Sequence, residues 1–357
     1  MADTKSRTYN IGIIGIGYWG PNWVRVVNEH PNCRITWISD ILESNFDKIT
    51  SAGSDITFTT DYRDMLKDHP KNGKRPDAVV IATPASTHFN IAKEVIEAGM
   101  HVLVEKPLAI DTAHCKELTA LAKAKGVTLM VGHTSLYNAG IVYAKNVMDG
   151  KFQAHNLGKI QDIQAERMSL GPIRNDVNAI WDFASHDIYI LNHLIGQKPV
   201  AVSCQAGHIP EGRKNLETVG VLHLFYSNNI MGRITVSSIW PEKVRRVMIV
   251  GDKAALNFDD VASDKKVTIY QKGVNYNPTT QSHAQHQAMV TDGDIFVPKI
   301  SYNEPLKEEF KHFIDCFENN KTPISDGEQG HDVVKILHAA TKSLRERDGG
   351  KVPLEWR

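Results

Sequence analysis

The sequence lacks an excess of charge of either sign and any long apolar run. Its 357 residues include 41 basic and 41 acidic side chains. No strongly basic face is therefore expected, and nucleic acid is not an expected partner. No apolar run approaches the length of a membrane span, and the polar start MADTKSRTYN has no signal-peptide core. We therefore predict a cytoplasmic protein without a membrane partner.

Cysteine is scarce, and the motifs of several other enzyme classes are missing. The chain has no C-x-x-C spacing, no G-x-S-x-G and no G-K-[ST], and its four cysteines stand apart, at Cys33, Cys115, Cys204 and Cys316. This pattern suits a reducing compartment and argues against a zinc ribbon, a disulfide framework, a serine hydrolase and a P-loop. His283-x-x-His286 has no acidic or cysteine cluster at ligand spacing, so no metal site is predicted.

The order of apolar segments predicts two domains. Through about residue 135, short apolar runs such as 77–83 and 101–105 alternate with helix-length segments, which indicates a doubly wound parallel sheet. Strand-like runs then follow one another between residues 200 and 270, which indicates a largely antiparallel sheet in an α+β domain. We predict a Rossmann domain over residues 1–135 and a substrate-binding and oligomerisation domain over 136–357, whose C-terminal helices could pack back on the first domain. A helix is expected over 182–195 and a long loop over 273–299.

The stretch from Ile11 to Asp40 predicts a dinucleotide site. A β-rich run is followed by Gly15, Gly17 and Gly20 at G-x-G-x-x-G spacing, then by a helix-length segment and a second apolar run. In such a site the first glycine permits a tight turn, the second lets the backbone approach a pyrophosphate, and the third lets the helix pack on the strand. The pyrophosphate then lies at the positive end of the helix dipole.

Asp40 indicates which dinucleotide is bound. It lies 25 positions after Gly15, close to the spacing of a ribose-binding acid, and Ile41 and Leu42 follow it rather than a basic residue. A carboxylate accepts hydrogen bonds from a ribose 2′-OH and repels a 2′-phosphate, which favours NAD over NADP. Tyr18 and Trp19, inside the glycine turn, are also assigned to the cofactor. A FAD or S-adenosylmethionine site on a similar turn is the alternative.

Three further segments are expected at the carboxyl ends of the parallel strands, where ligands bind in such sheets. They are Thr83–His88 (TPASTH), Glu105-Lys106-Pro107 and Gly132–Asn138 (GHTSLYN). Lys106 directly follows a buried strand, so it can hydrogen-bond a substrate hydroxyl at the mouth of the cofactor crevice. The assignments in these segments are Thr83, Pro84, His88, Glu105 and Lys106 to the cofactor, and Tyr137 and Asn138 to the substrate.

A second candidate group lies in the segment DFASHD. Asp182 and His186 are four residues apart, so on a helix the carboxylate could orient the imidazole for removal of a proton from an alcohol. An ordinary surface pair has the same spacing. The preceding loop could hold a charged sugar: Arg174 could pair with a phosphate or carboxylate, and the remaining substrate assignments are Asn175, Asp176 and Trp181.

Taken together, these motifs resemble the glucose–fructose oxidoreductase/inositol dehydrogenase/rhizopine-catabolism family. The resemblance covers nearly the whole chain, through GIGYWG (15–20), ATPASTHFNIAKEVIEAGMHVLVEKPLA (82–109), DFASHD (182–187) and EPLKEEFKHFIDC (304–316). It implies that Lys106, Asp182 and His186 are the catalytic groups. It also implies a homodimer or homotetramer, with the open face of the second sheet at the interface.

Within that family, the run 167–187 looks most like nucleotide-sugar 3-dehydrogenases, such as those acting on UDP-N-acetylglucosaminuronate. The resemblance therefore implies hydride transfer between a secondary alcohol of a sugar and a nicotinamide. Two alternatives stay open: an inositol or free-sugar dehydrogenase, and a regulator that binds NAD without catalysis. Whether Lys106 or His186 is the base is also open.

Overall fold

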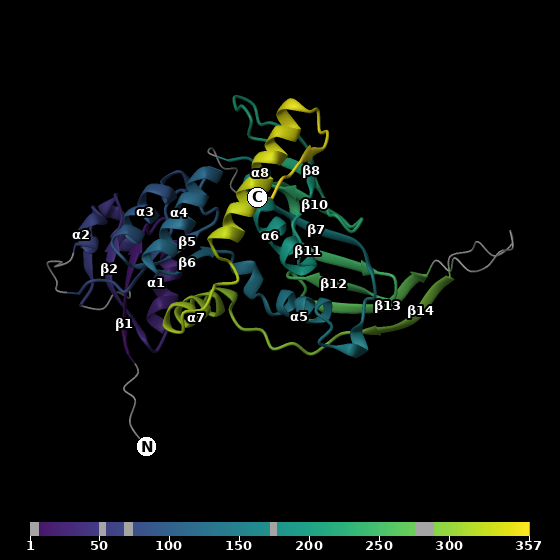
Figure 1. Cartoon of the computed structure of the whole chain (residues 1–357), viewed down its shortest axis with the longest axis horizontal. Coiled ribbons are helices and arrows are strands. Elements are labelled where there is room, and N and C mark those ends of the chain that lie inside the picture. The colour runs from purple at the N-terminus through teal and green to yellow at the C-terminus, as the bar shows by residue number, and fades with distance from the viewer. Residues whose placement is uncertain (1–6, 50–54, 68–73, 172–176, 276–288, 357) are drawn as a thin grey trace, which may run out of the picture. The chain divides into compact units, whose positions relative to one another are not determined.

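The computed structural model describes residues 7–49, 55–67, 74–171, 177–275 and 289–356 (Figure 1). The chain forms two compact units. The first contains residues 1–134 and 304–334, and the second contains residues 135–303 and 335–357. The first unit is thus built from two separate stretches of chain, and the division passes through the last long helix.

The first unit is a six-stranded parallel sheet with strand order β3-β2-β1-β4-β5-β6. Its strands are β1 (Tyr9–Ile14), β2 (Cys33–Ser39), β3 (Thr57–Thr59), β4 (Ala78–Ile81), β5 (His101–Glu105) and β6 (Leu129–Gly132). Every residue of β4 is buried, because helices cover both faces of a parallel sheet. The strand order reverses between β1 and β4, which is the switch point where doubly wound sheets bind their ligands.

Helices cover the sheet, and the first four of those named here also connect its strands. They are α1 (Gly20–Glu29), α2 (Arg63–Leu66), α3 (His88–Glu97), α4 (Thr112–Lys125), α7 (Pro305–Glu318) and the first part of α8 (Gly327–Glu346). Helix α3 lies beside α4, and α1 packs against α7 (Figure 1). Helix α4 begins at Asp111, whose side chain accepts a hydrogen bond from the Ala113 N–H, and ends at Gly126 in the left-handed conformation.

The second unit contains a nine-stranded sheet with strand order β14-β13-β12-β11-β7-β10-β9-β8-β15. All neighbours are antiparallel except β7 and β10. The strands are β7 (Ile160–Leu170), β8 (Ala201–Gly207), β9 (Val219–Phe225), β10 (Met231–Ser237), β11 (Ile239–Gly251), β12 (Ala255–Asp259), β13 (Val267–Asn275), β14 (Met289–Phe296) and β15 (Val352–Pro353). Helices α5 (Ala139–Met148) and α6 (Ser185–Ile195) pack on one face.

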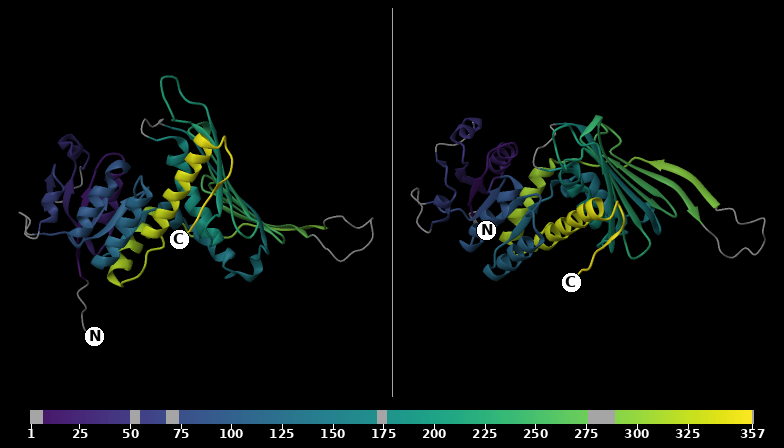
Figure 2. Two further views of the ribbon diagram at one scale, coloured as in Figure 1. Left: turned by 45° about the horizontal axis from the view of Figure 1, so that its top comes forward. Right: turned by 90° about the horizontal axis from the view of Figure 1, so that it is seen from above.

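The burial pattern of the second sheet follows from this one-sided covering. Along β9, every second residue is buried and those between are partly exposed. Figure 2 shows the sheet as one layer with the β13–β14 hairpin extending from its edge. The predicted fold class, a Rossmann sheet followed by an α+β domain with a largely antiparallel sheet, is confirmed.

Two local predictions differ from the structure. The expected loop over 273–299 contains strand β14, which was missed because Asp292, Gly293 and Asp294 are poor strand formers. The expected helix over 182–195 begins instead as a π-helical turn, Ile180–Ala184, followed by α6. Such turns are rare and often lie at functional sites.

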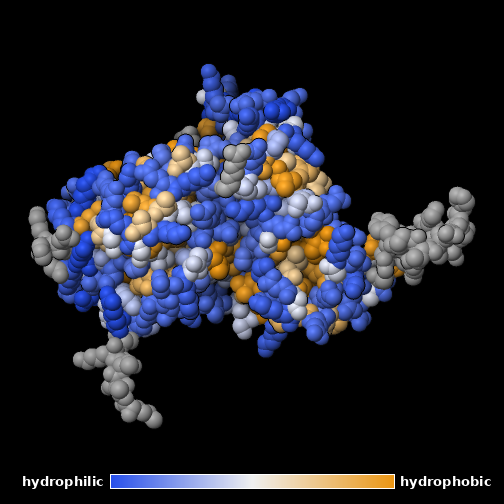
Figure 3. All heavy atoms as spheres, in the orientation of Figure 1, coloured by the Kyte–Doolittle hydropathy of each residue, from blue (hydrophilic) through white to orange (hydrophobic). Residues whose placement is uncertain are grey.

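Hydrophilic residues cover most of the face seen in Figure 3, with smaller apolar areas between them. Among the residues that the structure describes, no helix combines the length and apolar character needed to span a bilayer.

Candidate functional site

The glycine turn between β1 and α1 has the geometry of a dinucleotide-binding loop. Gly15 has φ of 89°, and a Cβ there would lie 2.8 Å from the carbonyl oxygen of Ala82. A Cβ on Gly20 would collide with the carbonyl oxygen of Gly15, so the helix can begin this close to the strand only with glycine. A Cβ on Gly17 would meet nothing within 4 Å. Gly17 thus leaves room for a ligand beside the backbone at the start of α1.

The aromatic residues of this turn are exposed. Tyr18 is 89% and Trp19 is 43% accessible, and Ile41 beyond β2 is 84% accessible. Large apolar side chains in contact with water are the usual sign of a surface that another molecule covers. The flat aromatic base of a dinucleotide is a group that packs on side chains of this kind.

Asp40 lies at the end of β2 and is 9% exposed. One carboxylate oxygen accepts a hydrogen bond from the Ile16 N–H at 2.8 Å, and the other accepts from the Leu42 N–H and the Asn45 amide, both at 2.9 Å. A carboxylate has about four acceptor sites, so one remains for a ribose hydroxyl. Asp40 therefore joins the glycine turn to the end of β2. It can still accept one further hydrogen bond, as its predicted role in binding a ribose hydroxyl requires.

The segments after β4 and β5 are joined by His88. Its Nδ1 lies 2.8 Å from the carbonyl oxygen of Pro107, and its Nε2 lies 2.9 Å from that of Thr83. Burial lowers the pKa of His88, although both carbonyl oxygens favour the protonated ring. Because both ring nitrogens are engaged, His88 holds the Thr83-Pro84 turn against the Lys106-Pro107 turn. Its predicted contact with a cofactor stays a prediction.

Lys106 is partly exposed, directly after β5, and its peptide bond to Pro107 is cis. Its neighbour Glu105 is buried and accepts a hydrogen bond from Trp23 Nε1 at 2.8 Å. Burial raises the pKa of the Glu105 carboxyl, and the Trp23 hydrogen bond and the Lys106 charge act against this rise. Burial and the Lys106 charge lower the pKa of His133, after β6, to about 3. The charge of Lys106 thus acts on both a buried imidazole and a buried carboxyl at the ligand-binding edge.

In the second unit, Asp182 lies in the π-helical turn and His186 in the first turn of α6. Both are partly exposed. A π turn has more residues per turn than an α-helix, so residues four apart still lie on about the same side. The four-residue spacing therefore still places Asp182 and His186 on about the same side, although the first turn is π-helical. The catalytic roles of Lys106, Asp182 and His186 stay predictions.

The next residue, Asp187, anchors this helix to the sheet. It is 2% exposed and accepts two hydrogen bonds of 2.9 Å from the Arg167 guanidinium on β7. Arg245 on β11 is the register partner of Arg167 and lies 3.6 Å from the Asp260 carboxylate. Burial and the neighbouring charge of Arg167 lower the pKa of Arg245.

The sequence analysis missed this group of charged side chains. Its residues lie on β7, α6 and β11, and Arg167 and Arg245 are 78 positions apart in the sequence. Only the pairing of β7 with β11 in the sheet brings these two arginines together. The only feature of the sequence that could have indicated this group was a charged residue inside a strand-like run. The group provides a cationic side chain, Arg245, close to the helix that carries His186.

The predicted substrate residues fall into two sets. Tyr137 is buried; the Asn138 side chain caps α5 by accepting from the Gly140 N–H and donates to Asp260. The indole N–H of Trp181 donates to Thr341. Roles for these three residues in substrate binding stay predictions. Arg174, Asn175 and Asp176 lie outside the described residues.

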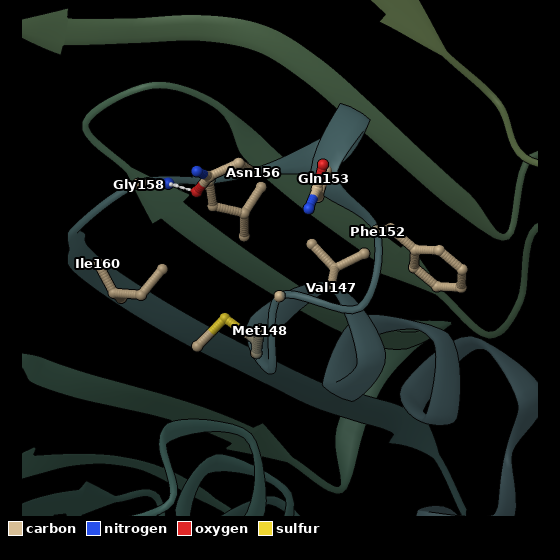
Figure 4. Close-up of a pocket in the computed structure, with 9 residues that line it drawn as sticks. Val147, Met148, Phe152, Gln153, Asn156, Gly158 and Ile160 are labelled. Carbon is tan, nitrogen blue, oxygen red and sulfur yellow. Dashed lines mark hydrogen bonds between the residues drawn. The ribbon is translucent and has the colours of Figure 1, made fainter.

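No group of metal-ligating side chains is found among the described residues. His283 and His286 lie outside them. A pocket of about 480 Å³ in the second unit is lined by parts of α5 and the segment leading to β7, including Val147, Met148 and Ile160 (Figure 4). Its Asn156 side chain accepts a hydrogen bond from the Gly158 N–H. None of the predicted site residues lines this pocket.

The fold and the glycine turn define a dinucleotide-binding oxidoreductase. Residues 9–133 match the family model described as "Oxidoreductase family, NAD-binding Rossmann fold", and residues 178–354 match its "C-terminal alpha/beta domain". The chain belongs to this family, the glucose–fructose oxidoreductase/inositol dehydrogenase/rhizopine-catabolism (Gfo/Idh/MocA) oxidoreductases. The predicted family is therefore confirmed.

Two relatives illustrate the range of the family. The UDP-N-acetylglucosamine 3-dehydrogenase of Acidithiobacillus ferrooxidans is 25% identical over 265 residues, which is 74% of this chain and 76% of the relative. The NADP-linked scyllo-inositol 2-dehydrogenase IolW of Bacillus subtilis is 24% identical over 371 residues, covering 96% of each chain. The predicted enzyme class, an NAD(P)-dependent dehydrogenase acting on CH–OH groups, is confirmed.

Two solved structures show the same fold. The gentamicin-biosynthesis protein GenD2, in complex with NAD, has a TM-score of 0.80 at 22% identity and covers 100% of this chain and 99% of its own. The WlbA dehydrogenase of Bordetella pertussis, in complex with NADH and UDP-GlcNAcA, has a TM-score of 0.75 at 23% identity, with 98% and 100% covered. The family model over residues 9–133 confirms the predicted nicotinamide dinucleotide-binding domain, and the residues assigned to the cofactor stay predictions.

Proposed function

We propose that this protein is an NAD-dependent dehydrogenase that oxidises a secondary alcohol of a sugar. The proposed position is carbon 3 of a nucleotide sugar, such as a UDP-N-acetylhexosaminuronate. The observation that carries the proposal is the cation Lys106 at the ligand-binding edge of the Rossmann sheet, directly after the buried Glu105 that ends β5. Support for the substrate class comes from the likeness to the UDP-N-acetylglucosamine 3-dehydrogenase, which covers three quarters of the chain.

The residues of the chain have distinct tasks in this proposal. The first domain, proposed as residues 1–135, binds the dinucleotide at the glycine turn and Asp40, and the nicotinamide supplies the hydride acceptor when bound. The second, proposed as residues 136–357, binds the sugar. His186, oriented by Asp182, removes the proton of the sugar hydroxyl, and the Lys106 ammonium stabilises the oxygen as negative charge develops on it. The reverse assignment, with Lys106 as the base, uses the same groups.

An anionic substrate suits the charges of the second unit. Asp187 neutralises Arg167 in a bidentate pair, whereas Arg245 has a carboxylate only at 3.6 Å. A guanidinium binds carboxylate and phosphate with two parallel hydrogen bonds. We infer that Arg245, together with the predicted Arg174, Asn175 and Asp176, favours a charged sugar or its diphosphate over an uncharged polyol.

The preference for NAD over NADP follows from Asp40. A 2′-phosphate would stand against a carboxylate that already accepts three hydrogen bonds and holds the glycine turn, so it cannot turn away without disrupting that turn. Titration of the wild-type protein with NADH and NADPH, followed by fluorescence, should give tighter binding of NADH. Tighter binding of NADPH would contradict this assignment.

The decisive experiment follows nicotinamide reduction by absorbance, with NAD and each of four compounds. These are UDP-N-acetylglucosaminuronate, UDP-N-acetylglucosamine, glucose and myo-inositol. Reduction with the nucleotide sugars only is the expected result. Lys106→Met should abolish it while NAD still binds, and Lys116→Met, which removes an exposed lysine of α4, should leave it unchanged.

The other outcomes identify the alternatives. Reduction with the free polyols would place the protein with the inositol dehydrogenases, a function that its relative IolW carries. Binding of NAD without turnover of any compound, at high substrate and with a second sugar added to regenerate the cofactor, would favour a regulator.

We also propose that the protein is a homodimer or homotetramer. Exposed apolar side chains on the second unit, including Leu170 at 71% and Trp240 at 46%, support this. Light scattering coupled to size exclusion should give a mass of two or four chains, and a monomer would contradict the proposal.

A further inference from the structure

Two glutamate carboxyl groups are buried among the described residues of the first unit. Glu105 ends β5 and is 8% exposed, and Glu309 lies on α7 and is 0% exposed. Glu309 stands on the apolar side of its helix, between Leu306 and Phe313. Carboxylates are rarely buried unless they are paired or bonded, so the position of Glu309 calls for a reason beyond packing.

The surroundings of the two carboxyls differ. Glu105 accepts a hydrogen bond from Trp23 Nε1 and is stabilised as an anion by the Lys106 charge. Glu309 accepts a hydrogen bond of 2.5 Å from Thr134 Oγ1 with one oxygen, and its other oxygen has no partner among the described residues. Burial and the negative charge of Glu105 raise the pKa of Glu309 well above its ordinary 4.5.

The other charged groups near α7 do not compensate a charge on Glu309. Those on α1 and the start of α7 pair with one another at the surface, namely Arg25, Glu29, Glu304 and Lys307. His30, which packs edge-on against Phe310, and His133, after β6, both have lowered pKa values because they are buried, so they are neutral at neutral pH. Two carboxylates in one water-poor site repel each other, and one of them takes a proton.

We propose that Glu309 is a positioning residue for Lys106: it carries a proton at neutral pH, so that Glu105, directly before Lys106 in the chain, remains the only carboxylate of this pair. The role of Lys106 in the reaction rests on the proposed function; the proton on Glu309 does not. Glu309 acts through Glu105, because Thr134 fixes it beside the end of β6, the strand next to β5. A negative charge on Glu309 would place a second anion beside Glu105 and change the electrostatic field in which Lys106 is held.

The first test looks for the proton directly. Protein labelled with ¹³C at the glutamate side-chain carboxyl should show, at pH 7, one signal at the position of an un-ionised acid. That signal should disappear in Glu309→Gln and persist in Glu318→Gln, which changes an exposed residue at the other end of α7. If every glutamate of the wild-type protein is ionised at pH 7, the proposal is overturned, whether or not the variant folds.

The second test uses stability. The folded state holds one proton more than the unfolded state between pH 4.5 and the raised pKa, so wild-type stability falls as pH rises through this window. The unfolding constant of the wild type, divided by that of Glu309→Gln, should therefore rise about tenfold per pH unit there. A constant ratio would overturn the proposal.

The third test addresses the link to Lys106. The pH profiles of kcat/KM for wild type and Glu309→Gln should coincide at acidic pH, where both side chains are neutral, and diverge at alkaline pH, where Glu309 alone ionises. Superimposable profiles would overturn the positioning role. A chain with the proton on Glu309 but no turnover of any sugar would refute the proposed function instead, so the two failures are distinguishable.

Discussion

The buried pair between Arg167 and Asp187 gives the sharpest quantitative prediction. Both side chains are largely shielded, at 13% and 3% exposure, and they form two hydrogen bonds of 2.9 Å. Removing one partner of such a pair leaves an uncompensated buried charge, which costs about 3–5 kcal/mol. The free energy of unfolding should therefore fall by about that amount in either Asp187→Asn or Arg167→Met.

The two single substitutions should not cost the same. Asp187→Asn leaves two guanidiniums side by side, because Arg245 is the register partner of Arg167. Arg167→Met leaves Asp187 with Arg245 as a neighbouring cation. Asp187→Asn should thus be the more harmful, and the double variant Arg167→Met/Asp187→Leu should regain most of the loss, since apolar replacements of a buried pair are often neutral.

Urea denaturation followed by circular dichroism measures these differences, and the chain offers a matched control. Arg246 follows Arg245 on β11, and it pairs with Glu166, the residue before Arg167 on β7. The Arg246 side chain is 46% exposed. Arg246→Met should cost no more than about 1 kcal/mol. The reasoning would be refuted if Arg167→Met proved as harmful as Asp187→Asn, or if the double variant were no more stable than either single one.

Three further predictions concern the first unit. Gly17→Ala should leave the melting temperature unchanged and weaken NADH binding in a fluorescence titration. Gly15→Ala, at a residue with φ of 89°, should lower the melting temperature. Equal melting temperatures for the two variants would contradict this prediction. His88→Leu removes the ring between two partly buried carbonyl oxygens and leaves the one that accepted its N–H without that donor, at roughly 1–3 kcal/mol. This variant should lower kcat, and an unchanged kcat would exclude a role in holding the Lys106 turn. The pKa of His133 is lowered to about 3, so between pH 3 and 6.5 the unfolded state binds more protons than the folded state. The free energy of unfolding should therefore fall by up to about 1.4 kcal/mol for each pH unit as the pH drops from 6.5 toward 3. His133→Gln should remove that part of the slope in acid denaturation curves.

Much of the first unit could be predicted because its signals are local. An all-apolar run such as 78–81 indicates a strand buried on both faces, and the spacing of three glycines specifies a turn that few other residues permit. The carboxyl edge of a parallel sheet then follows from topology. The amino-acid sequence alone therefore suffices to assign Thr83, Lys106 and His133 to one edge of the sheet.

The second unit was harder to predict because its important contacts are not local. The pair of Arg167 with Asp187 and the proximity of Arg245 depend on the order of strands in the sheet, which the sequence does not encode locally. The π-helical turn before His186 has no sequence signal of its own. Glu309 is a different case, since its position between Leu306 and Phe313 on one helical face could have identified it as a buried acid.

The two-part composition of the first unit has a consequence for synthesis of the chain. Helix α7 packs Phe310 near Trp23 of α1, and the Ser325 carbonyl accepts a hydrogen bond from the Val131 N–H on β6. A ribosome therefore makes the last piece of the Rossmann unit, residues 304–334, only after residues 135–303 of the second unit. One flank of the nascent N-terminal portion therefore stays uncovered while strands β7 to β14 of the second unit are made. A fragment ending near residue 134 would retain that flank permanently, and would aggregate or recruit chaperones rather than serve as a minimal cofactor-binding module.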